Sequence, residues 1–246
     1  MAREALALRP DMSVAVLTGA GISAESGIAT FRDSGGLWER YDVSQVATPE
    51  GFRRDPDLVW RFYSERRRQA LAAIPNAAHR ALAEMERFLE SRGRFTLVTQ
   101  NVDGLHQRGG ARNVLEVHGS LFRTRCSNPG CPQAATEWPD RELHLDGAPR
   151  CAECGQVLRP AVVWFGEALD PRILFQAEQA VKHCDLFLVV GTSGVVWPVA
   201  GLVHVARDQG VRSVLVNLEP PENHRYFDEM HLGKAAEILP SLLRLE

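Results

Sequence analysis

The stretch VAVLTGAGISAESGIATFRDSGGLW, residues 14–38, joins a short apolar run to a glycine-rich loop. Gly19, Gly21 and Ala24 match the loose pattern G-x-G-x-x-G/A, in which glycines let a backbone approach a pyrophosphate at the start of a helix. The Ser26–Gly27 pair would weaken a long crossover helix, so we expect a short helix followed by a loop that covers the ligand. For this pattern alone, a tight turn without a ligand is the alternative.

Short apolar runs recur along the rest of the chain without polar alternation, which is typical of strands buried on both faces of a parallel sheet. Segments with helical spacing lie between them. The sequence therefore predicts an α/β fold with a Rossmann-like, doubly wound parallel sheet. The expected strands are residues 14–17, 95–98, 114–117, 161–165, 186–190 and 214–216, and the expected helices are 58–71, 77–89, 173–181 and 199–206.

Two stretches interrupt this alternation. Residues 34–75 combine a Gly-Gly loop with a long helix, and residues 122–160 contain four cysteines and many turn-forming residues. We expect a helical insertion and a zinc-ribbon insertion that together form a smaller domain. The Rossmann-like domain would then be discontinuous, built from residues 1–33, 76–121 and 161–246.

The four clustered cysteines follow the spacing C-x4-C-x19-C-x2-C. Two close pairs of thiolates can complete the tetrahedral shell of one zinc ion, so we expect a structural zinc without an open position for water. Four unrelated buried thiols are the alternative. A fifth cysteine, Cys184, lies between an expected helix and strand, where a packed core thiol is favoured over a reactive one. The predicted zinc ligands are Cys126, Cys131, Cys151 and Cys154.

Charge and hydropathy exclude several classes of function. The 246 residues carry 28 basic and 31 acidic side chains, a net charge of −3, so no overall field favours nucleic acid or an anionic membrane. The apolar runs are much shorter than the roughly 20 residues of a membrane helix, and the first residues lack the features of a secretory signal. We expect a cytoplasmic protein; the sequence carries no signal for its oligomeric state.

Polar residues follow four of the expected strands, where an open α/β sheet forms its ligand crevice. His118 is one of them, and an imidazole suits general-base catalysis near neutral pH, although a lone histidine is as often structural. We expect these groups to converge with the glycine-rich loop. They are Gln100, Asn101, Asp103, His118, Gly191, Thr192, Ser193, Asn217 and Glu219.

Several of these motifs together resemble the sirtuin family of NAD-dependent protein deacylases. They are GAGISAESGIATFRD, QNVDGLH (residues 100–106), HG (118–119), the two cysteine pairs, FGE (165–167) and GTS (191–193). The resemblance covers nearly the whole chain and implies a Rossmann-type NAD-binding domain with a small zinc-binding domain.

The resemblance also implies roles for individual residues. His118 would be the catalytic base, and Asn101 would orient the nicotinamide end of NAD. The acylated peptide would bind as an extended strand between residues 163–167 and 194–196. NAD would contact Gly19, Ala20, Gly21, Ile22, Ser23, Phe31, Arg32, Trp38, Gln100, Asn101, Val102, Asp103, Gly191, Thr192, Ser193, Asn217, Leu218, Glu219 and Ala235, and the peptide would contact Val163, Phe165, Gly166 and Glu167.

The implied reaction consumes NAD as a co-substrate. The acyl oxygen of a modified lysine attacks the ribose carbon as nicotinamide leaves, and His118 takes a proton from a ribose hydroxyl. The products are free lysine, nicotinamide and O-acyl-ADP-ribose. Such an enzyme gains much of its rate from holding its reactants in position and excluding water.

The window VWRFYSERRR, residues 59–68, indicates the acyl group. Tyr63 and Arg66 share one helix face, and in the sirtuin branch that prefers short acidic acyl groups a Y-x-x-R pair reads the distal carboxylate. Ala24 is also similar to that branch, so the resemblance implies succinyl and malonyl specificity with deacetylation retained. The alternative is a solvated run, residues 66–68, beside a packed tyrosine. Gly194, where many relatives carry a larger apolar residue, puts peptide affinity in doubt.

Two other functions would use the same NAD site. One is a protein ADP-ribosyltransferase, and the other is a non-enzymatic sensor of NAD or ADP-ribose. The intact set Asn101, Asp103 and His118 argues against a sensor. A Rossmann dehydrogenase is disfavoured by the absence of the standard fingerprint.

Overall fold

The main sheet of the protein contains six parallel strands. The computed structural model describes residues 5–29 and 41–245. The strands lie in the order β3-β2-β1-β7-β8-β9, so the direction of winding reverses between β1 and β7. This arrangement confirms the predicted doubly wound parallel sheet. The strands are β1 (Ser13–Thr18), β2 (Arg94–Thr99), β3 (Val114–Glu116), β7 (Leu186–Val190), β8 (Arg212–Asn217) and β9 (Glu229–Leu232).

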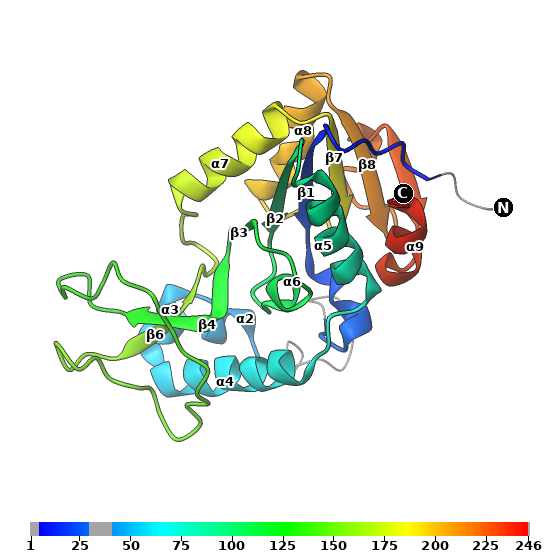
Figure 1. Ribbon diagram of the computed structural model, residues 1–246. Coiled ribbons are helices and arrows are strands. Elements are labelled where there is room, and N and C mark those ends of the chain that lie inside the picture. The colour runs from blue at the N-terminus through cyan, green and yellow to red at the C-terminus, as the bar shows by residue number, and fades with distance from the viewer. Residues whose placement is uncertain (1–4, 30–40, 246) are drawn as a thin grey trace.

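Helices cover both faces of this sheet (Figure 1). Val14 and Val16 of β1 pack in one core with α5 (Ala77–Leu89) and α9 (Ala235–Leu242). Ala15 and Leu17, the alternate residues of the same strand, pack in another core with α7 (Pro171–Lys182) and α8 (Leu202–Asp208). Because both faces of the strands are buried, their sequences are apolar without alternation.

A second, antiparallel sheet lies beside the first, in a lobe whose described residues form three helices as well. Figure 1 shows the two sheets side by side. Its core contains Trp60, Phe62 and Trp164, and the indole Nε1 of Trp60 donates a hydrogen bond to the carbonyl of Leu158 at 2.7 Å. The elements of this lobe are β4 (Gly119–Cys126), β5 (Trp138–Pro139), β6 (Leu158–Val162), α2 (Val43–Val46), α3 (Pro49–Arg54) and α4 (Pro56–Ala72).

The strand expected at residues 161–165 was assigned to the wrong sheet. The observed strand, β6, spans Leu158–Val162 and pairs antiparallel with β4. Ala161 and Val162 are buried, and Val162 belongs to the core of the second lobe. A strand enclosed on both sides reads as a continuous apolar run whichever sheet it joins, so the pattern alone did not distinguish the two.

Other differences concern the last part of the chain. The strand β9 was not predicted because its sequence, EMHL, contains no apolar run and its residues are half-buried or exposed. The helix α9 was not predicted either; it contains Pro240, a residue unfavourable inside helices, yet it buries Ile238 and Leu239 against α5. The helix expected at residues 199–206 begins as a 3-10 turn, η3 (Val199–Gly201), before α8. Two further short elements are α6 (Leu105–Arg108) and η4 (His224–Tyr226).

Within residues 5–29 and 41–245, no helix has both the length and the apolar character that a bilayer span requires.

A fully buried arginine connects α4 to the second sheet. Arg67 has no exposed surface, and its guanidinium donates hydrogen bonds to Asp140 Oδ2 at 2.9 Å, to Thr124 Oγ1 at 3.0 Å and to the carbonyl of Leu121 at 2.5 Å. Burial by itself would raise the pKa of Asp140, but the Thr124 hydroxyl and the charge of Arg67 lower that pKa to about 2. The run of arginines at residues 66–68 is therefore not simply a solvated face.

We expect Arg67→Ala to destabilise the protein by about 3–5 kcal/mol, because it leaves the Asp140 carboxylate in a largely buried position without its charged partner. Denaturant unfolding would measure the change. Arg68→Ala is the control, since the exposed Arg68 should contribute within about 0.5 kcal/mol. Equal effects of the two substitutions would contradict this account of Arg67.

Candidate functional site

The polar groups that follow the strands of the main sheet converge on one cavity of about 1430 Å³. The cavity lies at the carboxyl ends of the parallel strands, where the strand order reverses, which is the usual ligand position in such sheets. This convergence confirms the expectation from the sequence. Of the predicted contacts, Gly19, Ala20, Gly21, Ser23, Gln100, Asn101, Val102, Asp103, His118, Gly191, Thr192, Ser193, Asn217, Leu218, Glu219 and Ala235 line the cavity.

The glycine loop, residues 19–27, packs directly against the end of β7. The amide of Gly21 donates to the carbonyl of Gly191 at 2.9 Å, and a Cβ on Gly19 would lie 2.7 Å from that same oxygen. Side chains are therefore excluded at Gly19. Two 3-10 turns, η1 (Ala20–Ile22) and η2 (Ala24–Ser26), form most of the loop, which ends at Gly27 with a φ of 84°. The expected short helix is thus present as two single turns.

Of the four other predicted NAD contacts, one lies away from the cavity and three cannot be placed. Ile22 is fully buried in the core beneath the glycine loop and does not line the cavity, because η1 turns its side chain toward the helices. Phe31, Arg32 and Trp38 lie outside the described residues.

Three polar side chains at the base of the cavity form one buried hydrogen-bonded cluster. The hydroxyl of Ser23 donates to Asp103 Oδ2 at 2.7 Å, and the amide of Asn101 donates to Ser23 Oγ at 3.2 Å and to the carbonyl of Gly19 at 3.1 Å. Burial raises the pKa of Asp103, while the backbone amide of Leu105 and the Ser23 hydroxyl oppose that shift. The cluster fixes Asn101 and Asp103 against the glycine loop.

Two buried histidines behind this cluster were not predicted. His79 Nε2 lies 3.4 Å from Ser23 Oγ, and His106 Nε2 lies 2.8 Å from Thr18 Oγ1. Burial lowers the pKa of His79 to about 4 and that of His106 well below its ordinary value, so both rings are neutral at pH 7. His79 could have been recognised from the sequence, because it lies among the buried positions of an amphipathic helix.

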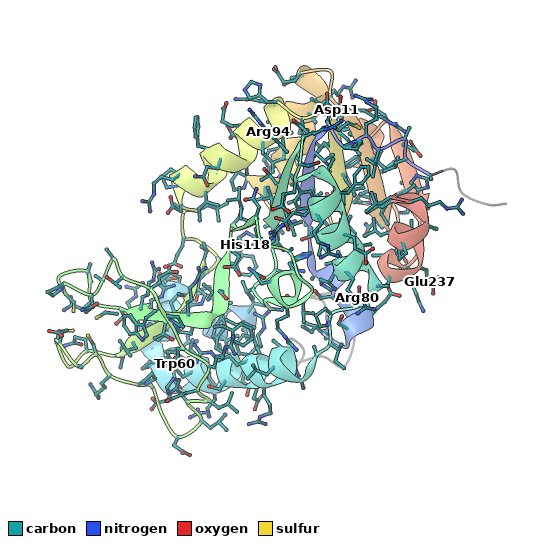
Figure 2. All side chains as sticks on the ribbon, in the orientation of Figure 1. Asp11, Trp60, Arg80, Arg94, His118 and Glu237 are labelled. Carbon is teal, nitrogen blue, oxygen red and sulfur yellow. The ribbon has the colours of Figure 1, made fainter. Side chains whose placement is uncertain are left out.

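His118 lies between β3 and β4, at the junction of the two sheets (Figure 2). Its Nδ1 is 3.0 Å from the carbonyl oxygen of Gln100. A carbonyl only accepts hydrogen bonds, so Nδ1 carries the proton and Nε2 of the neutral ring is an acceptor. Burial lowers the pKa of His118, against the opposing effect of the Gln100 hydrogen bond. The ring is therefore a neutral base on the cavity wall at pH 7.

Tyr63 and Arg66 enter the cavity from α4, in the second lobe. The phenol oxygen of Tyr63 accepts a hydrogen bond from Trp164 Nε1 at 2.9 Å, and the Arg66 guanidinium lies 5.9 Å from the Tyr63 ring centre. Because Oη accepts from Trp164, its own O–H can donate toward the cavity. Burial raises the pKa of Tyr63, which keeps the phenol protonated. Burial lowers the pKa of Arg66.

The segment after β6 forms the part of the cavity wall next to Tyr63. Val163, Phe165, Gly166 and Glu167 all line the cavity, together with Val195 and Val196 from the segment after β7. Glu167 accepts hydrogen bonds from both Nη atoms of Arg159, at 2.7 and 2.8 Å, and Phe165 leaves 51% of its surface exposed. This wall thus combines a fixed backbone with exposed apolar side chains.

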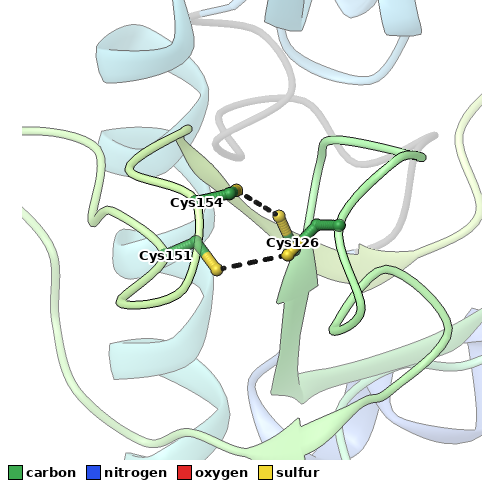
Figure 3. A group of neighbouring side chains, drawn as sticks. Cys126, Cys151 and Cys154 are labelled. Carbon is green, nitrogen blue, oxygen red and sulfur yellow. Dashed lines mark hydrogen bonds between the residues drawn. The ribbon is translucent and has the colours of Figure 1, made fainter.

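The four predicted metal ligands come together at one end of the second lobe (Figure 3). All four sulfur atoms lie within 4.8 Å of one another, and the Sγ atoms of Cys126 and Cys154 and of Cys131 and Cys151 are 3.6 and 3.8 Å apart. A tetrahedral zinc with bonds of about 2.3 Å would set sulfur atoms about 3.8 Å apart. The donor set and spacing therefore fit one zinc ion.

Cys184 does not belong to this cluster. Its thiol is buried in the core beside α7, donates to the carbonyl of Val181 at 3.3 Å, and has a pKa raised to about 11 by burial. The thiol is packed in the core, as the sequence predicts.

We expect the purified protein to contain about one zinc per chain and Cys151→Ser to lose it, with a lower unfolding midpoint, because a tetrahedral site that loses one of four thiolates binds zinc much more weakly. Elemental mass spectrometry and thermal unfolding would measure both. The control is Cys184→Ala, which should keep the metal. Equal zinc content in wild-type protein and Cys151→Ser would argue against the site.

Comparisons with known proteins agree with this geometry. The model of the Sir2 family matches residues 19–198. An NAD-dependent protein deacylase of Caulobacter vibrioides is 48% identical over 238 residues, covering 95% of this chain and 96% of its own. A solved complex of a Sir2 homolog with NAD is 40% identical, with a TM-score of 0.87 and coverage of 96% and 90%. A solved Sir2 protein with a deacetylated p53 peptide and 3'-O-acetyl ADP-ribose is 30% identical, with a TM-score of 0.80 and coverage of 93% and 91%. The family model alone spans well over half of the sequence, and the chain therefore belongs to the Sir2 family.

Proposed function

We propose that this chain is an NAD-dependent protein-lysine deacylase that consumes NAD as a co-substrate. The observation that carries the proposal is His118, a buried neutral imidazole whose Nδ1–H is held by the Gln100 carbonyl, on the wall of a cavity that also contains the glycine loop. The similarity to an NAD-dependent deacylase and to a Sir2–NAD complex supports the same activity.

The residues at the cavity fit a dinucleotide. Gly19 and Gly21 let the glycine loop pack against the end of β7, so that its backbone lines the cavity where a pyrophosphate would bind, and the buried pair Asn101 and Asp103 offers an amide and a carboxylate at the base. At the other end, the amide of Asn217 donates to the carbonyls of Thr192 and Glu219 at 3.0 and 2.9 Å, which orders the segment proposed to hold the adenosine half. The predicted contacts of Ser193, Leu218 and Ala235 belong to the same half.

NAD, when bound, supplies an electrophilic ribose carbon as nicotinamide departs. The chain must then hold an acyl oxygen beside that carbon and remove a proton from a ribose hydroxyl. His118 Nε2 is suited to accept that proton, because its Nδ1–H bond to Gln100 sets the tautomer and burial keeps the ring uncharged. Asn101, held by Gly19 and Ser23, would orient the nicotinamide end.

The acylated peptide is proposed to enter between residues 163–167 and 194–196, adding a strand across the cavity mouth. Val163, Phe165, Gly166 and Glu167 support this placement because they line the cavity and the Arg159–Glu167 ion pair anchors their backbone. The Sir2 structure that contains a deacetylated peptide supports a protein substrate.

The acyl group is proposed to include succinyl and malonyl as well as acetyl. Support comes from Tyr63 and Arg66, which bring a phenol donor and a guanidinium to the same end of the cavity. A guanidinium recognises a carboxylate by two parallel hydrogen bonds, and partial burial strengthens such a pair. Ala24 also lines the cavity, and its small side chain would leave room for the longer acyl chain.

The remaining expectations belong to the same proposal. Residues 1–33, 76–121 and 161–246 would form the NAD-binding domain, with 34–75 and 122–160 as the insertions of the small domain and one structural zinc in the latter. These bounds shift slightly, because β4 begins at Gly119 and β6 ends at Val162, and both strands belong to the second lobe. A cytoplasmic location is consistent with four cysteines kept reduced for zinc binding.

The rate of deacylation should fall only when the pH drops below the ordinary histidine pKa of about 6.5. Burial lowers the pKa of His118, and the neutral ring is the proposed base. We expect kcat/KM for an acylated peptide to be nearly constant from pH 7.5 to 6.5 and to fall as the pH drops further. His118→Ala should retain NAD binding and lose nearly all turnover at every pH.

An acid limb centred at pH 7 or above, or wild-type turnover by His118→Ala, would contradict this role. The same assays with labelled NAD separate the deacylase from an ADP-ribosyltransferase. Label attached to protein without release of free lysine would favour the transferase, and NAD binding without release of nicotinamide would favour a sensor.

Acyl selectivity should depend on Arg66. We expect Arg66→Met to lower kcat/KM about 10- to 100-fold on a succinyl-lysine peptide and only about 2-fold on its acetyl counterpart, because a charged hydrogen-bonding partner of the carboxylate is removed. Arg68→Met is the matched control, since Arg68 is exposed on the same helix and does not line the cavity. Equal losses on both peptides would count against carboxylate recognition.

A further inference from the structure

Asn76 stands at a junction between α5 and the glycine loop. It is the N-cap of α5, where its Oδ1 accepts hydrogen bonds from the amides of Ala78 at 2.9 Å and His79 at 3.4 Å. Its Nδ2 donates in the opposite direction, to the carbonyl of Ile22 at 2.8 Å and to Ser26 Oγ at 3.0 Å. One amide side chain thus joins the start of the helix to both 3-10 turns of the loop.

A second connection starts from the same residue. The backbone amide of Asn76 donates to His79 Nδ1 at 3.3 Å, so Nδ1 is unprotonated and His79 Nε2 carries the hydrogen in the neutral ring. That hydrogen faces Ser23 Oγ at 3.4 Å, and the Ser23 hydroxyl donates onward to Asp103. Asn76 is therefore hydrogen-bonded directly to the loop and is connected to the buried polar cluster through His79.

Asn76 itself does not line the cavity, whereas most of the loop that it holds does. We propose that Asn76 is a positioning residue for NAD: it holds the glycine loop in the conformation that receives the dinucleotide, without touching the ligand. This inference rests on the proposed function. Asn76 would then contribute to the affinity for NAD, whereas a residue that only caps a helix would not.

Asparagine is suited to this position because it combines an acceptor and a donor. Serine and aspartate are equally good N-caps, since their side-chain oxygens accept from the first amides of a helix. Neither offers the N–H groups that reach Ile22 and Ser26, and an aspartate would place a negative charge against the Ile22 carbonyl. Replacement by serine or aspartate thus separates the cap from the link to the loop.

The test compares Asn76→Ser with wild-type protein by calorimetric titration of NAD and by steady-state kinetics on an acylated peptide. We expect the Kd and KM for NAD to rise about tenfold, since two hydrogen bonds are lost, while the KM for the peptide and the unfolding midpoint change little. Asn76→Asp should keep the cap and raise the NAD Kd further.

Asn113→Ser is the matched control. Its amide also donates to a backbone carbonyl, that of Phe95, but Asn113 lies outside the cavity lining. The control should leave the Kd for NAD unchanged, which would show that loss of an amide-to-carbonyl bond is not enough. A rise with Asn113→Ser equal to that with Asn76→Ser would overturn the inference.

An NAD Kd within twofold of the wild-type value for both Asn76→Ser and Asn76→Asp would overturn the inference and leave the proposed function standing. Wild-type protein that neither binds NAD nor deacylates peptide would instead overturn the proposed function and this inference with it. Because the titration needs no catalysis, a defect in the chemical step does not obscure the result.

Discussion

The site depends on one steric constraint, the direct backbone contact between the glycine loop and the end of β7. Gly21 N donates to the Gly191 carbonyl at 2.9 Å, and Gly191 itself has a φ of 65°. A Cβ at Gly21 would lie 2.8 Å from the Gly191 Cα. The two segments therefore meet backbone to backbone at the point where the strand order reverses, a contact that a side chain at Gly19, Gly21 or Gly191 would prevent.

This close approach costs free energy, and side chains that hydrogen-bond to the loop offset that cost. A loop pressed against a strand end buries backbone groups that must find partners. The Gly19 carbonyl accepts a hydrogen bond from Asn101 Nδ2, and the Ile22 carbonyl accepts one from Asn76 Nδ2. The loop is therefore held by side chains from two different segments of the chain as well as by β7. Such a fixed loop reduces the ordering that a ligand must bring about on binding.

The features that could be predicted from the sequence are those with a local signature. The helix at residues 77–89 was expected with the observed bounds, and the cysteine spacing predicted a cluster that the structure assembles. The sheet to which residues 161–165 belong depends on pairing with β4, and the roles of Asn76 and His79 depend on contacts with the glycine loop more than 50 residues earlier in the chain. No local pattern encodes such partners, so these features required the structure.

The two lobes contribute different parts of the cavity wall, which separates the groups proposed to bind NAD from those proposed to select the acyl group. The glycine loop, Asn101 and Asp103 belong to the main sheet and its connections, whereas Tyr63 and Arg66 belong to a helix that packs on the second sheet through Trp164. His118 lies between β3 of the first sheet and β4 of the second. Changes in α4 can therefore alter the end of the cavity proposed for the acyl group without moving the groups proposed to hold NAD. His118, the proposed base, is attached to both sheets through the backbone and to Gln100 through its ring, so its tautomer does not depend on the acyl group.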